Sequence, residues 1–273
     1  MTNFESLVLG VVQGVTEFLP ISSTAHLRIV PALLHWEDPG AAYTAVLQLG
    51  SLVAVIGYFL PELLKMLGAA VRALTDRSRP PEPAARELVY LIVGTLPAGL
   101  AGVAFRHAIE GAFRSLWIIA TALIVVALLL AVVEKRARHV RAFGEITLRD
   151  AFMIGCAQAF AIIPGVSRSG STLAAAMALG FERAAAARFS FLLSVPIVAA
   201  AGAFEMPKVM KAIHAHALAA NTLVIGLVAA AVAGYASIAW LLRFLRARST
   251  IPFVIYRVAL GLLLIGMLAT GRL

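Results

Sequence analysis

The chain of 273 residues is 61% hydrophobic and only 14% charged, and its mean hydropathy is +0.93. Soluble domains carry about 25% charged residues, so this composition excludes an ordinary soluble protein and indicates a membrane protein. The net charge of +9 would suit a nucleic-acid binder, but the positions of the charges argue against that partner. Cys156 is the only cysteine, which excludes an internal disulfide and any metal site built from several cysteines.

The predicted elements follow a regular order along the chain. An apolar segment at 4–34, interrupted by Pro, Gly and hydroxyl residues, precedes uninterrupted apolar windows at about 41–61, 88–105 and 116–133. A second interrupted segment, 150–181, precedes windows at about 186–204, 220–242 and 251–270. Each uninterrupted window is long enough to cross about 30 Å of hydrocarbon as a helix. We therefore predict an all-α integral membrane protein with six transmembrane helices plus two re-entrant helical hairpins.

The basic residues set the predicted orientation. Fifteen of the twenty-three Lys and Arg residues lie in the segments 62–88, 134–149, 183–188 and 243–248. Positive charge collects in cytoplasmic loops, so we place these segments in the cytoplasm and both chain ends outside. The N-terminus lacks a basic start and a small-residue cleavage site, and we expect no removable signal peptide there. Since the basic loops report topology, we expect no nucleic-acid partner.

The two interrupted segments resemble each other. GVVQGVTEFLPISST at 10–24 and GCAQAFAIIPGVSRSGST at 155–172 share a Gly, a Gln three residues later, a Pro and a hydroxyl-rich run, once a one-residue gap is allowed. Three spans follow each segment, and an odd number of spans inverts the second half. We predict a single membrane domain, 1–273, made of an inverted repeat with halves at about 1–135 and 148–273. Two unrelated helices broken by proline are the alternative.

The first interrupted segment carries chemically reactive side chains. Gln13 and Glu17 are four residues apart and share one face of a helix, which Pro20 then ends. Hydroxyl groups and an imidazole follow at the start of the next helix: Ser22, Ser23, Thr24 and His26. Taken singly, these residues suit a helix cap and a core histidine. Together with an intramembrane Glu17, they indicate a functional site.

The second interrupted segment has the composition of an anion site. Gly165 and Gly170 permit tight turns and close approach of a ligand, and the planar guanidinium of Arg168 matches phosphate oxygens. Hydroxyl donors surround it: Ser167, Ser169, Ser171 and Thr172. The next helix begins with free amides and its positive dipole end. Arg257, inside the last span, is a further functional candidate because arginine is costly at membrane depth. Together the two segments predict a phosphoryl-transfer site, although not a nucleotide-binding P-loop.

These motifs resemble those of one known family, the bacterial undecaprenyl-diphosphatases associated with bacitracin resistance. The likeness covers Gln13, Glu17, Pro20, the Ser22 to His26 run and the run from Pro164 to Thr172, and it extends along nearly the whole chain. The resemblance implies hydrolysis of a C55 isoprenyl diphosphate to the monophosphate at the outer face of the bacterial inner membrane. It also implies a role in recycling the lipid carrier for peptidoglycan synthesis.

The resemblance also implies roles for individual residues. The catalytic set would be Glu17, Ser23, His26 and Arg168, and the residues around the diphosphate would be Gln13, Ser22, Thr24, Ser167, Ser169 and Thr172. A divalent cation, Mg²⁺ or Ca²⁺, would lie near Glu17. Many members carry Glu where this chain has Gln13, which weakens any site built on two carboxylates. Either Ser23 or His26 could be the nucleophile.

Other functions and partners stay open at this point. A transporter or flippase of polyprenyl phosphate lipid would share inverted repeats and broken helices, but transport does not require the Ser-Ser-Thr-x-His run. A lipid phosphatase of the PAP2 type is not supported, because its Lys-x6-Arg-Pro and Pro-Ser-Gly-His signatures are absent. The expected partners are the polyprenyl diphosphate lipid substrate and membrane lipids. The sequence leaves a homodimer open.

Overall fold

The computed structural model describes residues 1–76, 80 and 82–273, so the predicted cytoplasmic residues Arg77 and Arg79 lie outside the described residues. The described residues form twelve α-helices: α1 (Asn3–Phe18), α2 (Ser23–Leu34), α3 (Gly40–Tyr58), α4 (Leu60–Thr75), α5 (Pro83–Ala104), α6 (Arg106–Glu110), α7 (Leu116–Arg136), α8 (Leu148–Ala159), α9 (Arg168–Ala178), α10 (Arg183–His214), α11 (Ala220–Ala247) and α12 (Ile251–Ala269). Three short 3₁₀ helices join them: η1 (Ala112–Arg114), η2 (Phe143–Glu145) and η3 (Phe160–Ile162).

Six of these helices, α3, α5, α7, α10, α11 and α12, are long and apolar enough to cross a membrane. They coincide with the six predicted windows, and the part of the chain that the structure describes contains no strand. The prediction of an all-α protein with six spans is therefore confirmed, and the chain is a multi-pass membrane protein. Helix α10 is longer than its window because it continues beyond the apolar residues to His214.

The interrupted segments form two helical hairpins, α1–α2 and α8–α9. Both hairpins begin with a reciprocal cap, in which Thr2 and Glu5 bond each other's backbone N–H at α1, and Thr147 and Asp150 do so at α8. Helix α1 ends at Phe18, just before Pro20, and α8 ends through the short turn η3 before Pro164. Each hairpin thus has a helix break at its tip.

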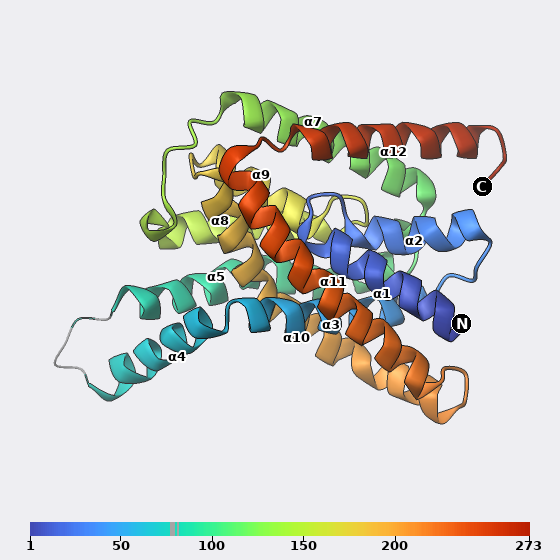
Figure 1. The fold of residues 1–273 in the computed structure, drawn as a ribbon, viewed down its shortest axis with the longest axis horizontal. Helices are drawn as coiled ribbons and strands as arrows, with labels where there is room; N and C mark the ends of the chain where they lie inside the picture. Colours follow the sequence, from blue (N-terminus) through green and yellow to red (C-terminus); the bar gives the residue numbers. More distant parts are fainter. Residues whose placement is uncertain (77–79, 81) are drawn as a thin grey trace.

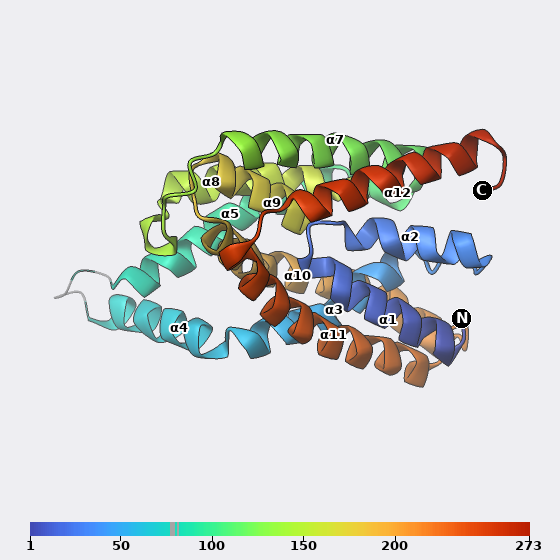
Figure 2. The same ribbon diagram turned by 45° about the horizontal axis from the view of Figure 1, so that its top comes forward.

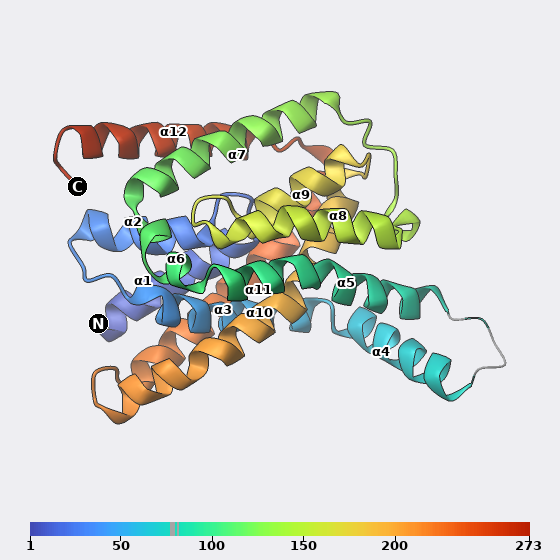
Figure 3. The same cartoon turned by 180° about the vertical axis from the view of Figure 1, so that it is seen from behind.

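The two hairpins enter the helical bundle from opposite ends and meet at its centre (Figures 1 and 3). Both chain termini lie at the end from which α1–α2 enters, and the α7–α8 connection lies at the other end (Figure 2). This arrangement does not conflict with the predicted re-entrant hairpins. The hairpin tips then lie near the middle of the bundle.

Small residues let each hairpin pack closely on a span. Gly10 of α1 lies against the backbone of Gly226 on α11, and Gly155 of α8 lies against the backbone of Gly94 on α5, so that a Cβ at either hairpin glycine would collide with the facing carbonyl. Close backbone approach at small residues is a common way to join helices in membranes. The packing is reciprocal, since each hairpin contacts the second span of the other half of the chain. This reciprocity is what the predicted inverted repeat requires.

Candidate active site

The tips of the two hairpins have matching backbone conformations. Ser22 (φ 76°) caps α2 and Ser167 (φ 73°) caps α9. Their Oγ atoms accept hydrogen bonds from the backbone N–H of Ala25 (3.4 Å) and Gly170 (3.0 Å), respectively. The same sequence spacing separates Ser22 from Ser167 and Gln13 from Gln158. The caps therefore align without the one-residue gap that alignment of the two prolines requires.

Hydrogen bonds join one tip to the other. The Gly165 N–H donates to Ser22 Oγ (3.1 Å), and Ser169 Oγ donates to the Leu19 carbonyl (2.9 Å). Arg257, fully buried on α12, donates to the carbonyls of Pro20 (3.0 Å) and Gly165 (2.7 Å). These carbonyls lie at breaks where helical partners are missing. Arg257 therefore acts as a structural cross-link between the hairpins.

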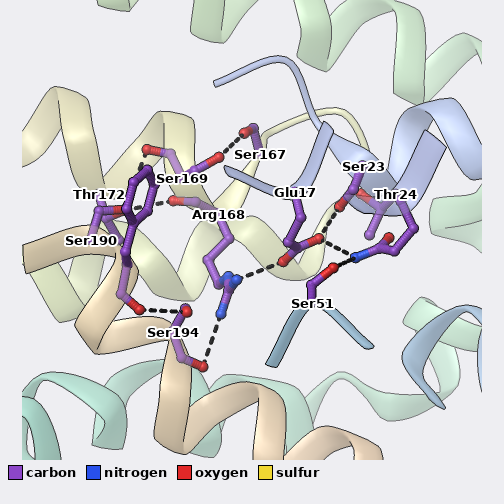
Figure 4. A network of polar contacts seen from close by, with 12 residues as sticks. Glu17, Ser23, Thr24, Ser51, Ser167, Arg168, Ser169, Thr172, Ser190 and Ser194 are labelled. Carbon is purple, nitrogen blue, oxygen red and sulfur yellow. Dashed lines mark hydrogen bonds and ion pairs between the residues drawn. The ribbon is translucent and has the colours of Figure 1, made fainter. Parts of the chain in front are cut away.

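Glu17 is the centre of the polar network between the tips (Figure 4). It is 5% exposed, and its Oε2 accepts hydrogen bonds from Gln13 Nε2 (2.7 Å) and from the Ser23 hydroxyl. Its Oε1 accepts from Arg168 Nη2 of the other hairpin at 2.6 Å. A hydroxyl that donates to a carboxylate is in position to lose its proton to that carboxylate.

Arg168, the first residue of α9, connects the second hairpin to the first hairpin and to α10. Besides its ion pair with Glu17, its Nη1 donates to the carbonyl of Ser194 at 3.1 Å. A guanidinium has five N–H donors, and these two contacts leave others directed to the surroundings. Because Arg168 also lines the cavity described next, its remaining donors suit an anionic ligand.

A cavity of about 240 Å³ lies beside this network. Its polar lining residues are Glu17, Ser23, Thr24, Thr44, Gln48, Arg114, Gln158, Ser167 and Arg168, and the remaining lining residues are almost all apolar. The start of α3 and the segment between α5 and α7 lie toward the end of the bundle that holds both chain termini (Figure 3). The cavity therefore extends from the hairpin tips toward the end predicted to face outward.

The structure brings Glu17, Ser23, Thr24, Ser167 and Arg168 together around this cavity. The other predicted substrate-binding residues lie outside its lining: Gln13, Ser22, Gly165, Ser169, Gly170, Thr172 and Arg257. Gln13 donates a hydrogen bond to Glu17, and the Thr172 hydroxyl lies 2.5 Å from the hydroxyl of Ser190 on α10. Gly165 (φ 99°) approaches the backbone of Ile119 on α7, where a Cβ would not fit. These residues therefore stabilise the hairpin tips on which the cavity residues lie.

His26 also lies outside the cavity lining. Its Nδ1 is 2.7 Å from the Ser22 carbonyl, and its Nε2 is 2.7 Å from the hydroxyl of Tyr256, whose ring stacks on the imidazole. A carbonyl only accepts hydrogen bonds, so Nδ1 carries the proton and Nε2 accepts from Tyr256. Both ring nitrogens are therefore engaged with Ser22 and Tyr256.

Several polar residues of the site were not predicted from the sequence. Ser51 accepts a hydrogen bond from Gln13, the Ser194 carbonyl accepts from Arg168, and Gln158 and Gln48 line the cavity. Ser51, Ser194 and Gln48 lie in spans, where single polar residues carry no motif. Gln158 was visible in the sequence as the partner of Gln13 in the repeat, and that match was the available signal.

The side chains around the cavity supply few ligands for a metal ion. No group of three or more His, Cys, Asp or Glu residues that could hold an ion occurs in the part of the chain that the structure describes. Among the cavity residues, Glu17 is the single carboxylate, and both its oxygens already accept hydrogen bonds. This site therefore does not suit a metal ion whose ligands are all protein side chains. One carboxylate does fit a cation that shares its other ligands with substrate phosphates, as Mg²⁺ often does.

Comparison with known proteins identifies the family. The family described as bacitracin resistance protein BacA matches residues 6–263. This chain belongs to the BacA family. It is 50% identical over 273 residues to the undecaprenyl-diphosphatase of Myxococcus xanthus, covering 100% of this chain and 91% of the relative. It is 49% identical over 276 residues to the undecaprenyl-diphosphatase of Gloeobacter violaceus, covering 99% and 93%.

Membership in the BacA family confirms the resemblance seen in the two motifs. A third relative, undecaprenyl-diphosphatase 2 of Frankia casuarinae, is 47% identical over 285 residues and is covered to 97% of its length. The matched region of the BacA family begins within α1 and ends within α12. It therefore covers nearly all of the helical bundle.

The role of Arg257 as a cross-link leads to a stability prediction. We expect Arg257→Met to lower the free energy of unfolding by at least about 3 kcal/mol, because each buried carbonyl left without a donor costs roughly 1–3 kcal/mol. Thermal unfolding in detergent measures the change. Arg272→Met, which removes the same charge from an exposed position near the C-terminus, is the matched control. Equal stability of the two variants would contradict the cross-link.

Proposed function

We propose that this chain hydrolyses undecaprenyl diphosphate to undecaprenyl phosphate and inorganic phosphate. The observation that carries the proposal is the Ser23 hydroxyl bonded to Glu17, whose other oxygen pairs with Arg168 from the second hairpin. The nucleophile Ser23, the base Glu17 and the phosphate-binding guanidinium of Arg168 thus share one cavity. The names of the relatives agree with this chemistry.

The proposed location is the outer side of the bacterial inner membrane. The cavity leads toward the end of the bundle that holds both chain termini, opposite the basic segments that the positive-inside rule assigns to the cytoplasm. Hydrolysis on that side would return the lipid carrier to peptidoglycan synthesis. The apolar outer surfaces of the spans contact membrane lipids, through which an isoprenyl substrate would arrive.

We propose Ser23 as the nucleophile in preference to His26. Ser23 Oγ transfers its proton to Glu17 and attacks the terminal phosphorus, so an Oγ–P bond forms as the bridging P–O bond breaks. Undecaprenyl phosphate leaves with the proton that Glu17 returns. Glu17 then accepts a proton from the attacking water, the Oγ–P bond breaks as phosphate is released, and Glu17 returns that proton to Ser23 Oγ. His26 is unsuited to attack because both its ring nitrogens are engaged with Ser22 and Tyr256.

Arg168 and the other cavity donors would hold the transferring phosphoryl group. The developing charge spreads over three equatorial oxygens, and a planar guanidinium can bind two of them. Ser167 and Thr24 add hydroxyl donors to the same cavity. Arg168 thereby binds the substrate and fixes the base, since it pairs with Glu17 from the opposite hairpin.

We further propose that a divalent cation, Mg²⁺ or Ca²⁺, binds together with the diphosphate, with Glu17 as the one protein carboxylate near it. When bound, such an ion neutralises phosphate charge. The small donor set around Glu17 supports an ion that shares substrate oxygens and argues against a resident one.

The nucleophile is tested by substitution of Ser23. We expect Ser23→Ala to lower phosphate release from undecaprenyl diphosphate by at least about a thousandfold and to abolish an acid-trapped phosphoenzyme. Ser237→Ala, which removes a hydroxyl that donates to the Ala233 carbonyl within α11, should react at the wild-type rate. A phosphoenzyme that persists in Ser23→Ala would pass the role to another residue.

The cation is tested by chelation. We expect EDTA to stop phosphate release from purified protein and added Mg²⁺ or Ca²⁺ to restore it. The two guanidiniums of the cavity, Arg114 and Arg168, already pair with Asp38 and Glu17 and leave much of the charge of a diphosphate without a counter-charge. Binding of isoprenyl diphosphate, measured by titration calorimetry with and without the ion, should weaken in parallel. Full activity in excess chelator would refute this part of the proposal.

A further inference from the structure

Gln158, at the end of α8, carries a buried side-chain amide. Its side chain is in the lining of the cavity shared by Glu17, Ser23 and Arg168, and the residue is only 2% exposed. Within the described residues neither its Oε1 nor its Nε2 has a hydrogen-bond partner. A buried polar group left unpaired is unfavourable, and most buried polar groups in proteins are paired. The amide can therefore form hydrogen bonds with a ligand that enters the cavity.

Comparison with Gln13 explains why Gln158 is free. The two glutamines occupy equivalent places in the hairpins, three residues after Gly10 and Gly155. Gln13 Nε2 donates to Glu17, four residues on, and to Ser51. The position four residues after Gln158 is Ile162, which offers no acceptor. The first hairpin uses its amide to hold the carboxylate, whereas the second leaves its amide open to the cavity.

We infer that Gln158 is a substrate-binding residue whose Nε2 donates a hydrogen bond to a non-bridging oxygen of the bound diphosphate. This inference rests on the proposed function. Phosphate oxygens only accept hydrogen bonds, so the ligand needs donors, and an amide is a neutral one. Because Glu17 and Arg168 already balance each other's charge, neutral donors such as Gln158 add phosphate affinity without disturbing that pair.

The decisive experiment replaces Gln158 by methionine, which has a similar length and no donor. We expect KM for undecaprenyl diphosphate to rise about ten- to a hundredfold, as for loss of a hydrogen bond to a charged group, while kcat changes much less. Affinity for an isoprenyl methylenediphosphonate, which cannot be hydrolysed, should fall by the same factor. Melting temperature should stay the same or rise, because an unpaired buried amide is removed.

Further variants separate binding from folding. Gln158→Glu keeps the shape but places a carboxylate toward the diphosphate, and we expect a larger rise in KM than for methionine. Cys156→Ala, on the same helix and outside the cavity lining, should leave KM unchanged. Gln13→Met should instead lower kcat and melting temperature, because Gln13 is bonded to Glu17 and Ser51.

Two results would overturn the inference. If Gln158→Met leaves KM and analogue affinity at wild-type values, Gln158 does not contact the substrate. If it lowers melting temperature and kcat without weakening analogue binding, the amide has a structural role. Both readings require that the wild-type protein releases phosphate from undecaprenyl diphosphate. Absence of that release would instead reject the proposed function itself.

Discussion

The structure depends on the ion pair between Glu17 and Arg168, because it joins two segments that are far apart in the sequence. Each charge lies at the centre of the helical bundle, where an unpaired carboxylate or guanidinium is strongly unfavourable. The pair spans 2.6 Å and is almost completely removed from solvent on the Glu17 side. Its formation requires the tips of both hairpins to meet. The ion pair therefore gives both buried charges a partner, and it also assembles the site.

The backbone at the tips adds a second constraint of the same kind. Helices that end inside the bundle expose N–H and C=O groups that have no helical partner, and the interior of a membrane supplies no water to satisfy them. Ser22 and Ser167 cap the following helices, and Arg257 binds carbonyls from both tips. The broken helices are therefore stabilised by one another. This mutual dependence ties the integrity of the fold to the geometry around Glu17.

Much of this arrangement could be predicted from the sequence because it rests on local periodicity and composition. The six spans follow from apolar length, and the shared face of Gln13 and Glu17 follows from helical spacing. The meeting of Glu17 with Arg168 was predicted from the chemistry of the two motifs. What the sequence left undecided was which hydroxyls and basic groups face the cavity. Ser22 and Arg257 have the residue types of ligand-binding groups, but they satisfy backbone atoms.

Other features depend on tertiary contacts that no local pattern encodes. Ser51 and Ser194 are single polar residues within long apolar helices, and they join the network only because α3 and α10 pass beside the hairpin tips. The pairing of His26 with Tyr256 links residues at opposite ends of the chain. It occupies Nε2 of the imidazole, which the motif alone does not reveal. The open amide of Gln158 likewise becomes evident only when its surroundings are known.

The most direct measurement of the central contact is a double-mutant cycle on stability. Glu17→Gln and Arg168→Gln, alone and combined, are compared by unfolding in detergent. If the two side chains pair as described, each single variant leaves a buried charge without its partner, and the double variant is more stable than the sum of the single losses predicts, by at least about 1 kcal/mol. Strictly additive losses would show that Glu17 and Arg168 do not interact and would contradict the account.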